Sequence, residues 1–508
     1  MKLVFRVDAS TQIGTGHVMR CLALAQAWQD AGGQPIFVMT TEAQALKSRL
    51  RSEGMEVINL SVQMGSAEDA KETATLAQHL GATWVVVDGY HFGAEYQQII
   101  KNFGLNLLFF DDYGHAAHYY ADIVLNQNIS ASESLYANRE PYTQLLLGTR
   151  YALLRREFWQ WREWRREMPT QARKILVTLG GSDPDNVTLK VIQALRLVEV
   201  HGIEAVVVVG GSNPHYEQLQ LATEVSHVPI RLERNAANMP ELIAWADVAI
   251  TGGGSTTWEL AFMGLPSLII VLADNQQAIA EKLGEMGVMV NLGWHEAVSA
   301  AKIKEAITSL SLSHTELPIT PATRAEMCKR GQELVDGEGT GRVLMHLEGK
   351  VLRLRPVRED DCKLLWQWAN DPEVRASAFS SDSISWEKHV QWFTHKLHDI
   401  NCHIFIALDS QDTPIGQVRF DTHNDEQAEI DVSLAQEKRG VGYGKFLINT
   451  AVKVLFSRTA IQAVHAFIKP SNEASIRAFE KANFTRTSRE VLKKQFALHY
   501  KRIRGNEE

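Results

Sequence analysis

Hydrophobic and polar positions follow two different patterns along the first two thirds of the chain. Short apolar runs, such as KLVFRVD at 2–8 and WVVVD at 84–88, end in polar or glycine residues. Between them lie stretches in which apolar residues recur every three or four positions, as in residues 18–28. Strands that alternate with helices predict parallel βαβ units, and the polar ends of the strands mark where such a sheet binds its ligand.

The same pattern starts again at KILVTLGGSDPDN, residues 174–186, and continues through SLIIVLAD at 267–274. A second α/β unit is therefore predicted from about Lys174 to about Glu348. Between the two units, WQWREWRRE at 159–167 is rich in Trp and Arg, and we predict a solvated connecting helix there.

From Val351 onward the pattern changes to short strands at hairpin spacing, followed by a glycine-rich helix start. The strands are IFIALDS, IGQVRFD and AEIDVSLA, and a helix is expected around LLWQWAND. The predicted fold class is α/β, with a pair of Rossmann-type domains followed by an α+β domain. The predicted domain ranges are 1–165, 166–348 and 349–508.

Composition and charge exclude several classes of protein. The 508 residues are 45% apolar and 22% charged, which suits a globular chain of about three domains. The formal charge of −8 argues against a nucleic-acid-binding protein, and no apolar run approaches the ~20 residues that span a bilayer. The start, MKLVFRVDAST, turns polar too early for a signal peptide. We therefore expect a cytoplasmic protein with neither a nucleic-acid nor a membrane partner, and its oligomeric state stays unknown.

The third unit carries the most specific motif of the sequence, RGVGYG at 439–444, between the predicted strand 429–434 and a helix. Glycines allow the backbone to approach a pyrophosphate closely, and the first N–H groups of the helix hold its negative charge. Because glycine also serves ordinary tight turns, the motif alone is weak evidence. A second strand, QAVHAFIK, then leads into PSNEASIRAFEKANF at 470–484.

In this order and at this separation, the two segments resemble the GNAT acetyltransferases over about residues 350–505. The resemblance implies acetyl-CoA as co-substrate, with its pyrophosphate at the glycine-rich turn and its thioester along the preceding strand. It also places the pantetheine arm near Asn472. The residues expected at acetyl-CoA are Val432, Leu434, Arg439, Gly440, Val441, Gly442, Tyr443, Gly444, Asn472 and Ser475.

Two further expectations concern the chemistry of this unit. Many members of that family have a Tyr that reprotonates the CoA thiolate where this chain has Phe479, so another group or a water must supply that proton. Glu429, at the start of the strand, is a candidate base for the acceptor amine, directly or through a water. The alternative for Glu429 is a solvated carboxylate at a strand end.

In the second unit, residues 246–277 place a strand end, three glycines and a helix start in succession. That arrangement suits a diphosphate at a helix N-terminus, with Glu259 close enough to accept ribose hydroxyls. The segment resembles the UDP-binding half of the lipid II GlcNAc transferase and its relatives. By that resemblance the phosphates lie at Gly253, Gly254, Ser255 and Thr256, the ribose at Glu259, and the sugar at Asn275, Gln276 and Gln277.

The first unit contributes IGTGHVMR at 13–20. His17 stands in the first turn of the predicted helix, where the helix dipole disfavours the imidazolium form and leaves the ring able to accept a proton near pH 7. A lone histidine is more often structural, but this one follows a glycine loop at a strand end in the expected cleft. We therefore predict a functional role for His17.

The opening segment VDASTQIGTGHVMRCLALA, the DGYHF segment ending at Phe92, YALLRREF at 151–158 and the 246–277 block together resemble one GT-B family. These are the UDP-sugar hydrolases of pseudaminic acid biosynthesis, which release UDP from UDP-2,4-diacetamido-2,4,6-trideoxy-β-L-altropyranose. The resemblance implies that His17 acts on a water that attacks the anomeric carbon with inversion. The other residues implied at the sugar or at UDP are Tyr90 and Asn275 as catalytic residues, Arg155 for departure of UDP, and Gly14, Gly16, Gly181 and Ser182 for binding.

No metal is expected. Asp183 followed by Pro184 reads as a helix N-cap followed by proline at the first helical position, in preference to a DxD metal motif. Asp111 and Asp112 read as a strand-end pair. The four cysteines have neither zinc-ligand nor disulfide-framework spacing.

The resemblances together predict a bifunctional enzyme with UDP-sugar and acetyl-CoA as its partners. In that pathway an N-acetyltransferase acetylates the 4-amino group of a UDP-sugar immediately before the hydrolase removes UDP, and the C-terminal unit fits that acetyltransferase. Two alternatives stay open. One is a UDP-sugar-dependent glycosyltransferase fused to an acetyltransferase, and the other is a non-catalytic sugar-nucleotide sensor.

Overall fold

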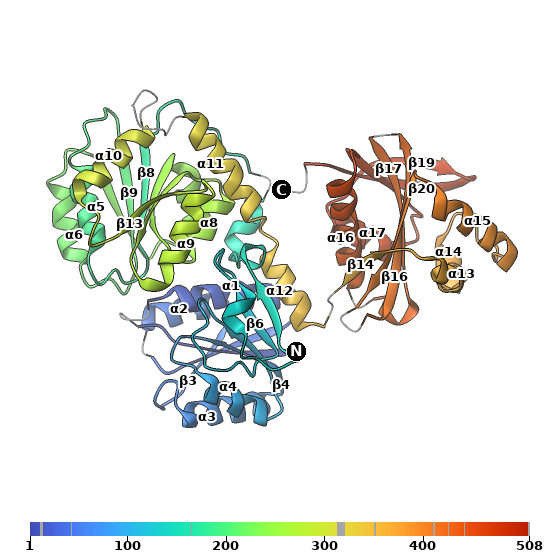
Figure 1. The fold of residues 1–508 in the computed structure, drawn as a ribbon, viewed down its shortest axis with the longest axis horizontal. Coiled ribbons are helices and arrows are strands. Elements are labelled where there is room, and N and C mark those ends of the chain that lie inside the picture. Colours follow the sequence, from blue (N-terminus) through green and yellow to red (C-terminus); the bar gives the residue numbers. More distant parts are fainter. Residues whose placement is uncertain are drawn as a thin grey trace. The chain divides into compact units, whose positions relative to one another are not determined.

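The computed structural model divides the chain into two compact units, Met1–Leu344 and Met345–Glu508, whose elements are labelled in Figure 1. The first unit contains two parallel sheets, and the second contains one sheet whose strand pairs are antiparallel except for one. The structure describes residues 1–10, 14–41, 43–162, 164–311, 321–349, 352–409, 412–424, 426–440 and 442–505.

The first sheet has seven parallel strands in the order β3-β2-β1-β4-β5-β6-β7. Its central strands are continuous apolar runs because both of their faces are covered, as is usual for a parallel sheet. The strand order reverses between β1 and β4, which is where open α/β sheets bind their ligands. The strands are β1 (Lys2–Val7), β2 (Gln34–Met39), β3 (Glu56–Asn59), β4 (Ala82–Asp88), β5 (Asn106–Phe110), β6 (Ile123–Asn126) and β7 (Gln144–Leu147). The helices are α1 (Gly16–Asp30), α2 (Gln44–Ser52), α3 (Ala67–Leu80) and α4 (Ala94–Asn102).

The second sheet has six parallel strands in the order β10-β9-β8-β11-β12-β13, with its reversal between β8 and β11. Buried Val, Ile and Leu side chains from its two faces form two apolar clusters with the surrounding helices. The strands are β8 (Lys174–Thr178), β9 (Glu204–Val209), β10 (Ile230–Arg234), β11 (Val248–Gly252), β12 (Ser267–Val271) and β13 (Val290–Trp294). The helices are α5 (Val187–Leu195), α6 (Tyr216–Glu224), α7 (Met239–Trp245), α8 (Thr256–Phe262), α9 (Asp274–Glu285), α10 (Ala300–Ser311), α11 (Pro321–Leu334) and α12 (Gly339–Leu347).

The prediction of a solvated helix at 159–167 is wrong. Three short 3-10 helices (Glu133–Tyr136, Thr149–Tyr151 and Arg156–Trp161) follow β6, and the last ends at Trp161. Beyond it Trp164 packs against the core of the second sheet, and the Arg166 guanidinium donates to the carbonyl oxygens of Ile243 and Ala246. The segment is therefore held by its aromatic rings and by the half-buried Arg166, and it does not form a solvated helix.

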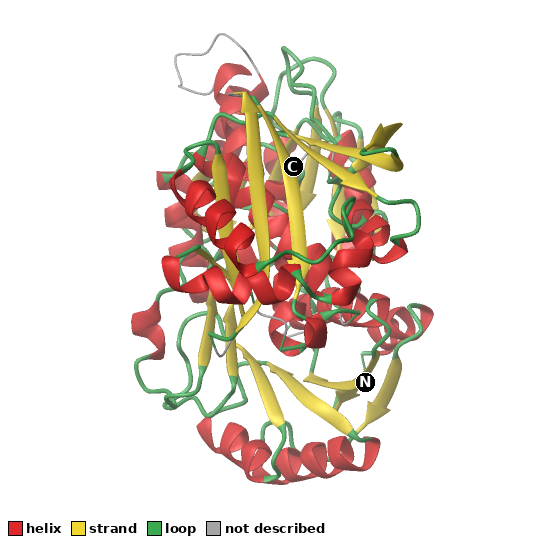
Figure 2. Cartoon of the chain, turned by 90° about the vertical axis from the view of Figure 1, so that its right-hand side faces the viewer, coloured by secondary structure: helices red, strands yellow, loops and turns green. Residues whose placement is uncertain are grey.

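The third sheet has the order β14-β15-β16-β17-β18-β20-β19. Helices α16 and α17 cover one of its faces, and α13 and α15 pack on the other face over β15 (Figures 1 and 2). Its strands are β14 (Arg353–Pro356), β15 (Cys402–Leu408), β16 (Pro414–Asn424), β17 (Gln427–Leu434), β18 (Ala463–Ile468), β19 (Thr485–Leu492) and β20 (Gln495–Ile503). Its helices are α13 (Cys362–Ala369), α14 (Pro372–Ser377), α15 (Trp386–His398), α16 (Tyr443–Arg458) and α17 (Glu473–Glu480), with 3-10 turns at Glu359–Asp361 and Gln436–Lys438.

Apart from the helix expected at 159–167, the strands and helices quoted from the sequence are present in the structure. Among the residues that the structure describes, no helix combines the length and the apolar character needed to cross a membrane.

Candidate active sites

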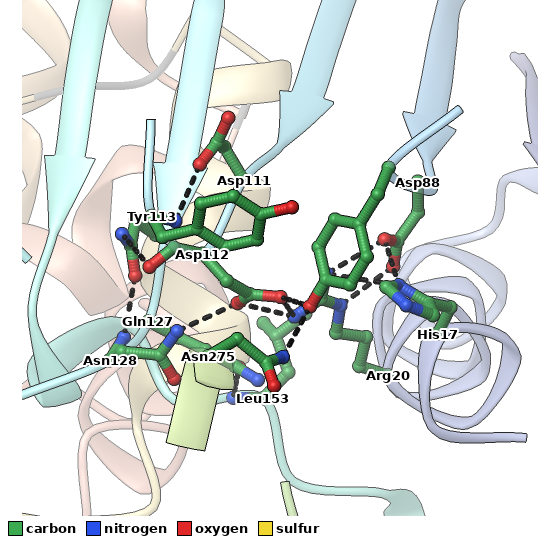
Figure 3. A network of polar contacts seen from close by, with 12 residues as sticks. His17, Arg20, Asp88, Asp111, Asp112, Tyr113, Gln127, Asn128, Leu153 and Asn275 are labelled. Atoms are coloured by element: carbon green, nitrogen blue, oxygen red, sulfur yellow. Dashed lines mark hydrogen bonds and ion pairs between the residues drawn. The ribbon is translucent and has the colours of Figure 1, made fainter. Parts of the chain in front are cut away.

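The first candidate site lies where the strand order of the first sheet reverses. The chain leaves β1, turns through Gly14 and Gly16, and starts α1, so that His17 occupies its first turn. Nδ1 of His17 lies 2.6 Å from Oδ1 of Asp88, the last residue of β4. Figure 3 shows the imidazole and this carboxylate facing each other. The sheet topology therefore brings a histidine and an aspartate 71 positions apart into direct contact.

Arg20, one helical turn after His17, fixes the Asp88 carboxylate from the other side. Its Nε and Nη2 each donate to one Asp88 oxygen at 2.7 Å, and its Nη1 reaches the oxygens of Asp112 at 2.8 and 3.0 Å. Burial alone would raise the pKa of the Asp88 carboxyl, but the charge and hydrogen bonds of Arg20 hold that pKa well below its usual range. Asp88 is therefore an ionised, immobilised carboxylate.

The ionised state of Asp88 decides the tautomer of His17. A carboxylate only accepts hydrogen bonds, so the short contact requires the hydrogen on Nδ1. Nε2 is then the basic nitrogen, and the side chain is one-tenth exposed. This is how a buried aspartate prepares a histidine to take a proton from a nucleophile.

The hydroxyl of Tyr90 connects this pair to a third predicted residue. It donates to Oδ2 of Asp112 at 2.6 Å and lies 2.8 Å from Nδ2 of Asn275, which comes from the segment after β12 in the second half of the unit. The Tyr90 ring also packs edge-on against the His17 ring, with centroids 4.9 Å apart. The structure thus brings together His17, Tyr90 and Asn275, all expected to be catalytic.

Sequence reasoning missed four members of this network: Arg20, Asp88, Asp112 and Asn128, whose Nδ2 donates to Asp112 at 2.7 Å. Two signals were available. Arg20 follows His17 by three positions and so shares its helix face. Asp88 ends the apolar strand β4 and Asp112 lies two positions after β5, both at the ligand edge of the sheet. No pattern in the sequence indicates that one arginine joins both carboxylates.

The glycine loops expected at UDP meet at one place in the first unit. A Cβ at Gly14 would lie 3.8 Å from Oγ of Ser182, one at Gly16 would lie 3.9 Å from Oγ of Ser255, and one at Gly181 would lie 2.4 Å from Oγ1 of Thr15. Ser182 follows β8 and Ser255 follows β11, so the loops of the second sheet's reversal face the loop of the first. Gly181 is required here because any side chain would collide with Thr15.

Gln276 and Gln277, both expected to contact the sugar, form hydrogen bonds with the protein itself. The Oε1 of Gln276 accepts from the backbone N–H of Gly253 at 2.8 Å and from that of Leu272 at 3.1 Å, while Nε2 of Gln277 donates to Glu281 at 2.9 Å. Gln276 therefore holds the glycine turn in shape, and Gly253 has already used its N–H. Gly254, Ser255 and Thr256 remain at the start of α8, exposed or half-buried.

Arg155 and Glu259 bond to each other. Nε and Nη2 of Arg155 reach Oε1 of Glu259 at 3.1 and 2.8 Å, and Nη1 reaches Glu157 at 2.8 Å. Burial raises the pKa of the Glu259 carboxyl although Arg155 opposes the shift. The pair joins α8 to the segment after the first sheet, so each residue has a structural partner besides any ligand.

The aspartates considered as metal ligands serve as backbone acceptors. Asp183 accepts from the N–H groups of Val187 and Thr188 at 2.9 and 2.8 Å, so it caps α5, but the helix starts at Val187. The expected N-cap at Asp183 with Pro184 at the first helical position is therefore wrong, because Asp183 and Asn186 take positive φ angles and delay the helix. Asp111 closes the turn after β5. Within the described ranges, no group of three or more His, Cys, Asp or Glu side chains could hold a metal.

The second candidate site lies where β17 and β18 separate. These parallel strands pair only from Gln427–Ala463 to Glu429–His465, although β17 continues to Leu434 and β18 to Ile468. The backbone of the last part of each strand is thus open to a ligand between them. β17 leads through the glycine-rich turn into α16, where Gly440 has φ 73° and Gly442, the N-cap, has φ 96°. Only glycine adopts these angles without strain.

The side chains around this turn form hydrogen bonds, ion pairs or packing contacts within the protein. Nη1 of Arg439 lies 2.7 Å from Asp371 and 3.0 Å from Glu373, and the hydroxyl of Tyr443 donates to the Gly349 carbonyl. Oδ1 of Asn472 accepts from the N–H of Ser475 and caps α17. A Cβ at Gly444 would lie 3.3 Å from the Cβ of Ala478. Val432 and Leu434 pack against the core. Val441 lies outside the described residues.

Phe479 is buried, and its ring meets Phe484 edge-on at 5.0 Å. Its position on α17 is therefore part of the apolar core of the sheet. Glu429 sits at the last pair before the strands separate, opposite Asp421 of β16 and His465 of β18. The alternation of β17 places it on the face away from α16.

Comparisons with known proteins identify a domain in each of the two units. Residues 175–334 match the glycosyltransferase family 28 C-terminal domain, and residues 352–485 match the acetyltransferase (GNAT) domain. An uncharacterized protein of Methanocaldococcus jannaschii is 23% identical over 497 residues, which cover 96% of this chain and 98% of that protein. The UDP-2,4-diacetamido-2,4,6-trideoxy-beta-L-altropyranose hydrolase of Campylobacter jejuni is 28% identical over 292 residues, covering 57% of this chain and 98% of the hydrolase.

A solved structure of spermidine N-acetyltransferase from Vibrio cholerae, in complex with CoA and spermine, is 20% identical and covers 31% of this chain and 97% of that chain, with a TM-score of 0.29. The two domain matches and the hydrolase relative confirm the predicted fold class and the predicted fusion. The chain joins a GT-B-like part, similar to the altropyranose hydrolases, to a C-terminal GNAT domain.

Proposed function

We propose that this chain, a GT-B-like part fused to a GNAT domain, is a bifunctional enzyme of pseudaminic acid biosynthesis. The first unit hydrolyses UDP-2,4-diacetamido-2,4,6-trideoxy-β-L-altropyranose to UDP and the free sugar. The GNAT domain acetylates the 4-amino group of the UDP-amino-sugar that precedes it. The observation that carries the proposal is the oriented His17–Asp88 pair in a part that spans the whole length of the similar hydrolase.

In the hydrolysis, Nε2 of His17 takes a proton from water while Asp88 holds Nδ1–H. The water oxygen forms a bond to the anomeric carbon, the bond from that carbon to the diphosphate oxygen breaks, and UDP leaves with the electron pair. Attack on the face opposite UDP inverts the anomeric centre. The loops of Gly14, Gly181 and Gly254 provide the convergent backbone for the diphosphate, consistent with the family 28 match.

For acetyl transfer, the strand separation after Glu429 and the positive-φ glycine turn fit an extended acyl thioester with a pyrophosphate at its far end. Asn472 lies at the start of α17 with its amide nitrogen still available as a donor. Glu429 is the proposed base for the acceptor amine, and the GNAT match supports acetyl-CoA as the co-substrate. Because Phe479 has no hydroxyl, the thiolate takes its proton from water.

The family 28 match also favours one alternative, a glycosyltransferase that uses the same UDP site. The two reactions differ in what attacks the anomeric carbon. With UDP-sugar in water alone, a hydrolase releases UDP at its normal rate, whereas a glycosyltransferase leaves its donor intact.

Hydrolysis in ¹⁸O-labelled water tests the proposal. Attack at the anomeric carbon places the label in the free sugar and leaves UDP unlabelled, and proton NMR of the first product shows the inverted anomer. Label in UDP would indicate attack at phosphorus and contradict the role given to His17. An intact donor after prolonged incubation would favour the glycosyltransferase.

A further inference from the structure

The face of the third sheet that lies opposite α16 and α17 carries a line of titratable side chains. Along β17, β18 and β20, alternate residues are buried toward those helices, so the residues between them point to the other face. The buried residues are Ala428, Ile430, Val464, Ala466, Leu498 and Tyr500. Those on the other face are Glu429, His465 and His499.

His465 and His499 are hydrogen-bonded to each other, and Glu429 lies beside His465 on the neighbouring strand. Glu429 and His465 are register partners at the last pair before β17 and β18 separate. Nδ1 of His465 lies 2.8 Å from Nε2 of His499, with the two rings stacked at 25°. Nδ1 of His499 lies 3.0 Å from Oε1 of Glu490, whose side chain is 41% exposed. The path therefore runs from the strand separation to solvent.

The hydrogen positions along the path follow from its end. Ser488 donates its hydroxyl hydrogen to Oε1 of Glu490 at 3.1 Å, so its oxygen accepts from Nδ1–H of His499 at 3.2 Å. In the neutral ring Nε2 of His499 is then the acceptor for Nδ1–H of His465. Every donor points away from the strand separation. A proton that arrives at the other nitrogen of His465 can therefore be matched by one leaving at Glu490, through the hydrogen bonds from His465 to His499, from His499 to Ser488 and from Ser488 to Glu490.

We propose that His465, His499 and Glu490 conduct to solvent the proton released by the acceptor amine during acetyl transfer. The inference rests on the proposed acetyltransferase activity and adds an exit path to it. The amine nitrogen forms the bond to the acetyl carbon, the carbon–sulfur bond breaks, and the thiolate takes a proton from water. The ammonium loses two protons in all, and one of them restores that water. An ammonium acceptor gives an amide and a free thiol with net release of one proton, which passes through Glu429 and His465 to His499 and Glu490.

His465 and His499 are positioning and relay residues, because neither is assigned a contact with substrate. The register partners of Glu429 and His465 are Asp421 and Lys501, and Asp431, paired with Arg419, shares the Glu429 face of β17. Asp421 is paired with Lys396 and Arg419 at 2.8 Å each. Its charge is thus compensated, and the histidine pair remains the connected route to solvent in this part of the sheet.

The test is the variant His499→Gln in the full chain, with acetyl-CoA and the UDP-4-amino-sugar, followed as thiol release from pH 6 to 9. We expect kcat/KM for the amine to fall about tenfold at the acid end, because general acid–base steps contribute 10²- to 10⁴-fold and water replaces part of the path. The deficit shrinks toward pH 9, where the amine is already neutral. The KM for acetyl-CoA stays unchanged, which also reports that the domain is folded.

Glu490→Gln, at the exposed end of the path, changes the pH profile of kcat/KM in the same way but by a smaller factor. His398→Gln, at an exposed histidine of α15, keeps the wild-type pH profile. A deficit that is equal at every pH, or no deficit, overturns the relay while leaving the acetyltransferase standing. A wild-type protein that releases no thiol overturns both.

Discussion

The two candidate sites are built from different parts of the protein, one from side chains and the other from backbone. The site at His17 consists of side chains that are buried and bonded to one another, with Arg20 joining Asp88 and Asp112. The site between β17 and β18 consists of backbone, namely two strands that stop pairing and a turn with positive-φ glycines. The first site orients His17 so that Nε2 can accept a proton. The second site leaves a gap between β17 and β18 in which an extended molecule can bind.

This difference predicts which kind of substitution inactivates each site. A preorganised side-chain network loses its function when one partner changes charge or direction, even if the shape is kept. A backbone site tolerates changes of nearby side chains and fails when a Cβ enters the turn. Substitutions should therefore separate the two sites by the kind of change as well as by its place.

The largest effect is expected for Asp88→Asn. The amide has the shape of the carboxylate but can donate to Nδ1 of His17, which selects the wrong tautomer, and removing the charge leaves Arg20 with one carboxylate. UDP release should fall on the order of 10³-fold, as for buried aspartates that orient a catalytic histidine. Steady-state UDP release measures it, with Asp30→Asn, a surface aspartate paired with Arg156, as the matched control. A variant near the wild-type rate would remove Asp88 from the account.

The second effect belongs to the backbone site. Gly442→Val places a β-branched residue at φ 96° in the turn, so the KM for acetyl-CoA should rise about tenfold or more from strain and steric exclusion. UDP release by the first unit should be unchanged. Gly505→Val, at φ 90° in the same unit but remote from the turn, controls for strain alone. Equal losses in both variants would contradict the role of the turn.

A smaller effect is expected for Tyr90→Phe. Its hydroxyl joins Asp112 to Asn275, while the ring packing against His17 remains in the variant. Loss of one hydrogen bond to a charged group, worth about 1.5–3 kcal/mol, predicts a fall in kcat/KM of about 10- to 100-fold. Tyr142→Phe, an exposed tyrosine bonded to the Tyr120 carbonyl, serves as control. If Asn275→Ala adds its full effect to Tyr90→Phe, the two residues act independently.

The smallest effect concerns acid stability. The pKa values of Asp88 and Asp112 lie below that of an unfolded aspartate, about 3.9, so they stabilise the folded state above that pH, and this contribution is lost as pH falls through the folded values. Hydrogen exchange, corrected for the intrinsic rate, should show β4 losing protection between about pH 5 and pH 1 by on the order of 2 kcal/mol. β17, whose neighbouring carboxylates are more exposed, should lose less. Parallel losses would contradict the comparison.

The sequence predicts the backbone site better than the side-chain network. Glycines in a fixed order predict a turn because few other residues adopt its angles. The segments 439–444 and 470–484 together then indicated the GNAT domain. The residues of the His17 network come from α1, from the end of β4, from the segments after β4, β5 and β6, and from α9. Only the folded order of the two sheets places them together. Arg155 and Glu259 were assigned to the ligand separately because nothing in the sequence indicates that they bond to each other.

The most direct test of the bifunctional account is a proton NMR time course of the full chain with the UDP-4-amino-sugar and acetyl-CoA, run beside His17→Ala. The account predicts acetylation and then release of UDP and free sugar in the wild type, and accumulation of the acetylated UDP-sugar in the variant. A UDP-sugar that persists unchanged in the wild type, or a variant that still hydrolyses at the normal rate, would contradict it.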